Sequence, residues 1–204
     1  MKVKTLSVGE LGTNCYLVTD QNTTVVIDPA DECDRIISAL EGKQPSAILL
    51  THGHFDHTGA VNELKTRYNC DVIISAEDEE MLSDNHKNAA FLIGAFPATI
   101  TADRLVCDGD SLEIGDLKFE VIATPGHTKG SVTYKIEDAL FTGDTLFCGT
   151  VGRCDLYGGN PTRLMDSLKK LAELDDSFTV YPGHDRKSTI GYEKQTNHYM
   201  RKIK

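Results

Sequence analysis

Three histidines and one aspartate lie within six residues of this chain, in the stretch HGHFDH at 52–57, and this cluster limits what the chain can fold into. Ligands on one helix face are three or four residues apart, whereas His52 and His54 are two apart and would diverge on a helix. The cluster directly follows the apolar run 47–50 and contains the turn-forming Gly53. We therefore expect a loop between a buried strand and a helix, at the edge where open α/β sheets bind ligands.

Three further segments repeat this order of an apolar strand, a turn of Pro or Gly, and one His or Asp. Because such turns are tight, each side chain is displayed at a defined strand end. Together the four segments offer His52, His54, Asp56, His57, His127, Asp144 and His184. Nitrogen and carboxylate ligands without a convergent thiolate favour zinc, with iron or manganese as alternatives. Seven ligands exceed what one tetrahedral ion uses, so the pattern predicts two metal ions.

From Thr23 onward, apolar runs alternate with helical stretches in the first half and with short turns in the second half. This order predicts an α/β fold, with hairpin turns at 108–110 and 114–116. The expected strands are 24–27, 47–50, 72–74, 103–107, 117–123, 131–136, 139–142 and 178–181, and the expected helices are 31–41, 60–67, 161–174 and a last one from about 188. Residues 77–100 have broken periodicity and receive no assignment.

With 204 residues the chain has the length of one domain, so we expect a single domain over 1–204. Its net charge of −10 disfavours nonspecific binding to nucleic acid or anionic membranes. The six cysteines are scattered without a CxxC pair, which indicates free thiols. No apolar run approaches the roughly 18 residues of a membrane span, and the first residues lack a secretory pattern, so a cytoplasmic location is expected.

At its histidines and aspartates the chain resembles the metallo-β-lactamase superfamily, whose signature is HxHxDH followed by a distant His, Asp and His. Over about residues 11–197 it is similar to short glyoxalase II-like (hydroxyacylglutathione hydrolase-like) enzymes. The motifs GDTLF at 143–147, GRCD at 152–155 and PGH at 182–184 carry this narrower resemblance. The resemblance implies a four-layer αβ/βα sandwich of two mixed sheets flanked by helices. It also implies the absence of the helical C-terminal domain of full glyoxalase II.

Carried over position by position, the resemblance also implies a role for each candidate ligand. The first metal would be held by His52, His54 and His127, the second by Asp56, His57 and His184, and Asp144 would bridge the two. Asp28 closes the apolar strand VVIDP, and there the resemblance implies a carboxylate that supports the metal-binding loop.

The resemblance implies that this site hydrolyses thioesters of the hydroxyacylglutathione type. Two zinc ions would lower the pKa of a bridging water to about 7 and so supply hydroxide, while Asp56 accepts or orients the proton. Arg153, Tyr157 and Lys187 are candidate substrate-binding residues, although an ion pair with Asp155 is an equal alternative for Arg153. The expected partner is a small-molecule thioester, with no nucleic acid and no membrane, and the sequence leaves the oligomeric state open.

Four alternatives to thioester hydrolysis remain at this stage. Persulfide dioxygenases share the fold and use one iron at the first site. Phosphodiesterase or ribonuclease activity is disfavoured by the acidic net charge. Hydrolysis of β-lactams or lactones is disfavoured because lactamases usually carry another residue at the position of Asp144. A metal-binding protein without catalysis would bind zinc and turn over no ester-like substrate.

Overall fold

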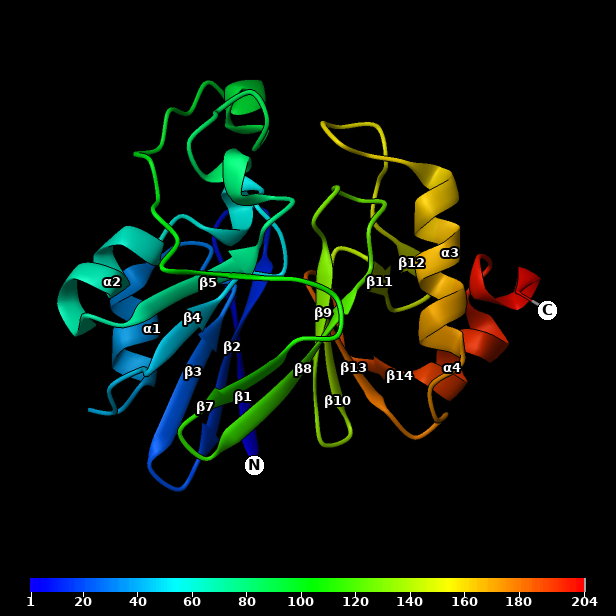
Figure 1. The fold of residues 1–204 in the computed structure, drawn as a ribbon, viewed down its shortest axis with the longest axis horizontal. Coiled ribbons are helices and arrows are strands. Elements are labelled where there is room, and N and C mark those ends of the chain that lie inside the picture. The colour runs from blue at the N-terminus through cyan, green and yellow to red at the C-terminus, as the bar shows by residue number, and fades with distance from the viewer. Residues whose placement is uncertain (204) are drawn as a thin grey trace.

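The computed structural model describes residues 1–203, whose strands form two six-stranded sheets packed face to face (Figure 1). In spatial order, the first sheet consists of β1 (Lys2–Val8), β2 (Thr13–Asp20), β3 (Thr23–Ile27), β4 (Ala47–Leu49), β5 (Asp71–Ser75) and β6 (Arg104–Val106). Strands β1 to β3 pair antiparallel, and β3 to β6 pair parallel. The parallel part agrees with the strand–helix alternation in the first half of the sequence.

In spatial order, the second sheet consists of β14 (Ser188–Thr189), β13 (Thr179–Pro182), β10 (Ala139–Gly143), β9 (Val132–Ile136), β8 (Leu117–Ala123) and β7 (Ser111–Ile114). Beside it lies a short hairpin of β11 (Leu146–Phe147) and β12 (Thr150–Val151). The turn after β7 closes a hairpin with β8, as predicted. The hairpin predicted at 108–110 is wrong, because these residues carry the chain from β6 in the first sheet to β7 in the second.

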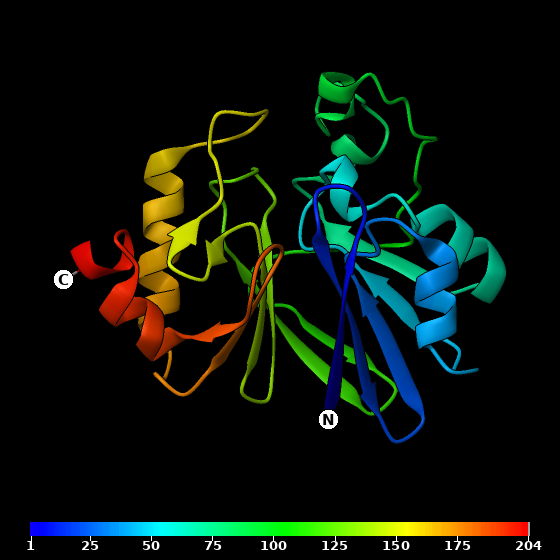
Figure 2. The same ribbon diagram turned by 180° about the vertical axis from the view of Figure 1, so that it is seen from behind.

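Helices cover both outer faces, so the molecule has four layers (Figures 1 and 2). Helices α1 (Cys33–Ala39) and α2 (Val61–Tyr68) lie on the first sheet, and α3 (Pro161–Ala172) and α4 (Ile190–Thr196) lie on the second. Three hydrophobic clusters fill the spaces between these layers, and the central one joins residues of both sheets, among them Ile27, Phe119 and Phe141. The predicted four-layer αβ/βα sandwich is therefore confirmed.

Six strands were not expected from the sequence, namely β1, β2, β7 and the two-residue strands β11, β12 and β14. Strands β1 and β7 lie at sheet edges, where polar residues on the outer face dilute the apolar pattern. Residues 77–100, which received no assignment, contain two 3₁₀ turns at Glu79–Leu82 and Ala90–Ile93, and the chain around them arches over one end of the first sheet (Figure 1). None of the helices among residues 1–203 combines the length and hydropathy needed to cross a membrane.

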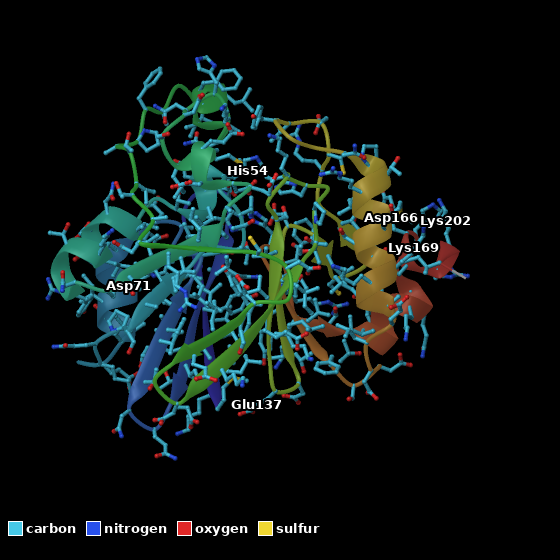
Figure 3. The ribbon with its side chains drawn as sticks, in the orientation of Figure 1. His54, Asp71, Glu137, Asp166, Lys169 and Lys202 are labelled. Carbon is cyan, nitrogen blue, oxygen red and sulfur yellow. The ribbon has the colours of Figure 1, made fainter. Side chains whose placement is uncertain are left out.

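Strands β3, β4, β8, β10 and β13 all end at the same edge of the two sheets. Strand β3 is parallel to β4, β10 is parallel to β13, and β8 runs in the direction of β10 because both are antiparallel to β9. Figure 3 shows His54 at this edge and Glu137, in the turn between β9 and β10, at the opposite end. The topology thus gathers the loops that follow these five strands.

Gly126 fixes the loop after β8 against the first turn of α3. Its φ is +139°, and a Cβ there would lie 2.3 Å from the backbone nitrogen of Leu164. We expect Gly126→Ala to lower the free energy of unfolding by more than about 3 kcal/mol, because strain and backbone displacement add. Gly109 has φ +83° but open space around it, so Gly109→Ala should cost only about 1–2 kcal/mol. Equal losses in urea unfolding would contradict the packing role of Gly126.

Candidate metal centre

The seven candidate ligands meet at the common strand edge, between the two sheets. They form three overlapping groups, in each of which the potential ligand atoms lie within 4.8 Å of one another. The groups are His52, His54 and His127; His52, His57 and Asp144; and Asp56, His57 and His184. The sequence spacing therefore identified side chains that are close together in space.

The first three imidazoles are buried next to one another. The ring atoms His54 Nδ1 and His127 Nε2 are 2.8 Å apart. Burial and the neighbouring histidines hold the pKa of His52 well below its usual range, and burial lowers the pKa of His54 to about 3. These two rings are therefore neutral at physiological pH, which is the form in which imidazole binds a metal.

The group of Asp56, His57 and His184 contains one carboxylate and two imidazoles. Below, it is called the second group, and His52, His54 and His127 are called the first group. Asp56 Oδ2 lies 3.6 Å from His57 Nε2 and 3.4 Å from His184 Nε2. Burial raises the pKa of Asp56, but the neighbouring His57 and His184 outweigh it and lower the pKa overall. Burial likewise opposes the charge on His57, yet Asp56, Asp144 and Asp28 hold its pKa well above the usual range. This side of the centre is strongly charged.

Asp144 lies between the two groups. Its Oδ1 is 3.3 Å from His57 Nε2, and its Oδ2 is 3.5 Å from His127 Nε2 and 3.6 Å from His184 Nε2. Burial disfavours the charged carboxylate, but these imidazoles lower its pKa below the usual range. Gly183 allows the close approach, because a Cβ there would lie 2.1 Å from Asp144 Oδ1. Asp144 thus contacts imidazoles of both sets, and its role as a bridging ligand stays a prediction.

Unpaired atoms show that the donor set fits metal ions. Within residues 1–203, six buried side-chain nitrogen or oxygen atoms have no hydrogen-bond partner. Four of them belong to this centre: His52 Nε2, His54 Nε2, His57 Nε2 and Asp144 Oδ1. Buried polar atoms without partners are costly, and a bound cation would satisfy ligand atoms of this kind. Zinc, iron and manganese all accept such nitrogen and oxygen ligands.

Hydrogen bonds on the other side of the rings fix their orientation. His127 Nδ1 donates to the Arg153 carbonyl oxygen at 2.7 Å, and His184 Nδ1 donates to the Leu11 carbonyl oxygen at 3.2 Å. His57 Nδ1 donates to Asp28 Oδ2 at 2.9 Å. Each of these bonds leaves Nε2 free to face the centre, as is usual for histidines that bind metals. Figure 2 shows the β1–β2 turn, which carries Leu11, beside the loop after β13, which carries His184.

Asp28 contacts the start of the loop that carries His52, His54 and His57. Its Oδ1 accepts a hydrogen bond from the Thr51 backbone nitrogen at 2.8 Å, and its Oδ2 accepts from the Thr51 hydroxyl at 2.6 Å and from His57. The Thr51 hydroxyl in turn contacts His52 Nδ1 at 3.1 Å. Asp28 has φ 49°, in the left-handed region, and the surrounding contacts help to hold it there.

Asp78 is a buried carboxylate that the sequence analysis missed. It accepts hydrogen bonds from the backbone nitrogens of Gly53 at 3.1 Å and Gly130 at 2.7 Å, and from the Thr128 hydroxyl at 2.6 Å. Gly53 separates His52 from His54, and Thr128 follows His127. Asp78 therefore joins the two loops that carry the first three imidazoles. The only sequence signal is an aspartate shortly after a strand, which is too common to single out.

The three candidate substrate-binding residues lie outside the cluster of ligands. Arg153 pairs with Asp155 through two hydrogen bonds of 2.6 and 2.7 Å, so its side chain forms the ion pair that was the alternative to substrate binding. Tyr157 donates its hydroxyl to Glu80 at 2.7 Å, and its ring lies under two lysine ammonium groups. Lys187 is exposed, with its ammonium 6.0 Å from the ring of Tyr181. A substrate role for these residues remains a prediction.

A buried cluster of imidazoles and carboxylates at one edge of two packed sheets defines a metal-binding α/β sandwich protein. The sequence model of the metallo-beta-lactamase superfamily matches residues 8–184, and the chain belongs to this superfamily. YqgX of Bacillus subtilis (strain 168), named a probable metallo-hydrolase, is 34% identical over 206 residues, which cover 98% of each sequence. GloC of Haemophilus influenzae, named a hydroxyacylglutathione hydrolase, is 31% identical over 208 residues, again 98% of each.

Solved structures of similar proteins carry several different names. BLEG-1, described as a B3 metallo-beta-lactamase, is 36% identical with a TM-score of 0.93, covering 98% of this chain and 99% of that one. TTHA1623, solved in a di-iron-bound form, is 36% identical with a TM-score of 0.89, covering 97% and 100%. ETHE1 from Myxococcus xanthus is 34% identical with a TM-score of 0.79, covering 97% and 84%. Sequence identity thus shows the superfamily and does not distinguish among these proteins.

The contacts of Asp78 predict that it maintains metal affinity. In Asp78→Asn, an amide NH₂ would face one of three hydrogen-bond donors, so one buried donor loses its partner at about 1–3 kcal/mol. We expect the free energy of unfolding to fall by about that amount and zinc affinity to fall roughly 10–100-fold. Chelator competition and urea unfolding measure these effects. Asp84→Asn, a matched change in the same segment that is only half-buried, should alter both by little, and equal effects would contradict the role of Asp78.

Proposed function

We propose that this protein is a dinuclear metal-dependent hydrolase that cleaves thioesters of the hydroxyacylglutathione type. The observation that carries this proposal is the arrangement of two ligand groups around one shared carboxylate, Asp144. A group of three imidazoles alone would suit one ion, whereas the addition of Asp56, His57 and His184 supplies a second set. The resemblance to GloC favours a thioester among the substrates of such a centre.

Zinc is the metal that we propose, with iron and manganese as alternatives. When two such ions are bound, they supply a water of lowered pKa as nucleophile and polarise the carbonyl group. Asp56 and Asp144, whose pKa values both lie below the usual range, provide carboxylate charge that balances the cations. Neutral His52 and His54 provide ligand atoms without adding positive charge.

Asp56 is the residue that we propose to handle the proton. Its carboxylate is ionised at neutral pH because neighbouring His57 and His184 lower its pKa. The Thr13 hydroxyl lies 3.4 Å from Asp56 Oδ2, so the oxygen that faces the two imidazoles also accepts a weak hydrogen bond. Asp56 can therefore accept or orient a proton of the attacking water. A thiolate is a good leaving group, so the reaction needs no separate acid.

Steady-state thiol release from S-lactoylglutathione tests this proposal, with the metal content of the protein determined beforehand. We expect turnover by protein with about two zinc ions, and a loss of more than about a hundredfold in Asp144→Ala, because even residues that only support metal ligands contribute 10–100-fold. Asp166→Ala removes an exposed aspartate on the outer helix α3 and should leave turnover unchanged (Figure 3). Absence of turnover by fully metallated protein on this and other thioesters would overturn the proposal.

Persulfide dioxygenase activity is the second candidate function. It is favoured by the group of His52, His54 and His127, which could hold one ion without the other candidate ligands. The di-iron form of the similar protein TTHA1623 supports iron as a metal for such a centre, although two ions are bound there. Oxygen consumption by iron-loaded protein with glutathione persulfide tests it directly. Consumption that requires His127 and persists in His184→Ala would favour the dioxygenase, whereas thiol release that requires both histidines would favour the hydrolase.

A further inference from the structure

Exposed apolar side chains gather beside the metal centre. Within residues 1–203, six exposed large side chains contain no polar atom: Leu11, Phe91, Leu92, Ile93, Phe96 and Leu105. Five of these belong to only two segments, the β1–β2 turn and residues 91–96. Phe96 has 75% of its surface exposed and Ile93 has 62%. Single exposed apolar residues are ordinary, but a concentration of them marks a binding surface.

These two segments form the walls of a groove with a volume of about 490 Å³. Its apolar lining includes Leu11, Phe55, Ile93, Phe96 and Pro97, and one of its walls contains the candidate metal ligand Asp56. This volume lies in the range of small-molecule sites. Because Asp56 lines the groove and also contacts the imidazoles, the groove adjoins the metal centre.

Hydrogen bonds fix both walls of the groove to segments that carry candidate ligands. In the first wall, the Leu11 carbonyl oxygen accepts a hydrogen bond from His184 Nδ1. Shortly before the second wall, the Asn88 carbonyl oxygen accepts a hydrogen bond from the Phe55 backbone nitrogen at 3.0 Å. Asn62 Nδ2 also donates to the Thr99 carbonyl oxygen at 3.2 Å, just beyond the groove residues. The groove is therefore formed before a ligand enters it.

The charges of the groove select against an anionic occupant. The charged residues that line it are Glu10, Asp31 and Asp56, and none of its described lining residues is basic. An anionic group would be repelled by these carboxylates and would bind without a counter-charge. The two carboxylates of a glutathione moiety are therefore unsuited to the groove. An uncharged apolar group is the occupant that its surface fits.

We propose that this groove binds the acyl group of the substrate, and that the preferred acyl group is an apolar chain of several carbons instead of the small polar lactoyl group. The proposal rests on the proposed thioester hydrolysis. When the carbonyl group of a thioester lies at the metal centre, its acyl part and its thiol part extend in different directions, and the groove binds the uncharged acyl part. Ile93 and Phe96 then determine the preference for acyl chain length.

Straight-chain carboxylates from butanoate to octanoate serve as probes, because they resemble the acid product and are not consumed. Their Kd values for the zinc-loaded protein are measured by calorimetry. We expect Kd to fall by roughly two- to fourfold for each added methylene, since burial of one methylene contributes up to about fourfold. In Phe96→Ser and Ile93→Ser this dependence on chain length should be largely lost, while the Kd of butanoate changes little.

Leu92→Ser is the matched control, because Leu92 is 55% exposed in the same segment and does not line the groove. It should keep the dependence of Kd on chain length. A dependence that is absent in the unchanged protein, or equally present in Phe96→Ser, would overturn the proposal. Sedimentation of the same variants tests a second copy of the chain as the occupant, and a dimer that dissociates in Phe96→Ser would also overturn it.

Thioester turnover separates failure of the groove from failure of the proposed function. The series acetyl-, butanoyl- and hexanoyl-glutathione is compared with S-lactoylglutathione, and the KM of hexanoyl-glutathione should be at least about tenfold lower, as its three additional carbons imply. Turnover with no preference for longer acyl chains would contradict acyl binding in the groove and leave the proposed hydrolase activity intact. Binding of carboxylates that depends on chain length, without any thioester turnover, would support the groove as an apolar binding site and contradict thioester hydrolysis.

Discussion

The buried carboxylate of Asp28 is the contact on which the metal-binding loop depends. It lies at the end of β3 and reaches the next strand end, where it binds the backbone and hydroxyl of Thr51 and the ring of His57. A short, rigid acceptor between two parallel strands can fix both the start of the loop and the direction of one imidazole. Asp28 has a φ of 49°, in the left-handed region that aspartate adopts more readily than most residues, and its hydrogen bonds help to hold it there.

The candidate metal centre brings many ionisable side chains together. Bringing five imidazoles and two carboxylates together costs free energy unless cations compensate it, and four unpaired buried atoms show where that cost lies. The two groups of candidate ligands differ in their protonation. Burial keeps His52 and His54 neutral, whereas carboxylates surround His57 and hold its pKa high. The first group is thus ready to bind a cation, and the second must release a proton as it does so.

Much of this site could be predicted from the sequence, because each ligand follows a strand and a tight turn that fix its position locally. The sandwich was predictable from the strand–helix alternation and the family motifs, although edge strands β1 and β7 were hidden by their polar outer faces. Asp78 was not predictable, since its partners Gly53, Thr128 and Gly130 are 25, 50 and 52 residues away. Local patterns carry no information about contacts of that separation.

The segment that gave no pattern contributes to both the candidate metal centre and the groove. Residues 77–100 contribute Asp78 to the support of the first imidazoles and Ile93 and Phe96 to the groove, so one irregular stretch joins the metal centre to the proposed acyl site. Helices and strands bury one face in the core, so apolar residues recur at regular intervals in their sequence. A stretch that leaves Phe96 exposed does not bury one continuous apolar face in the core, so its sequence shows no regular period. The proposed acyl site would give these exposed apolar side chains a ligand to contact.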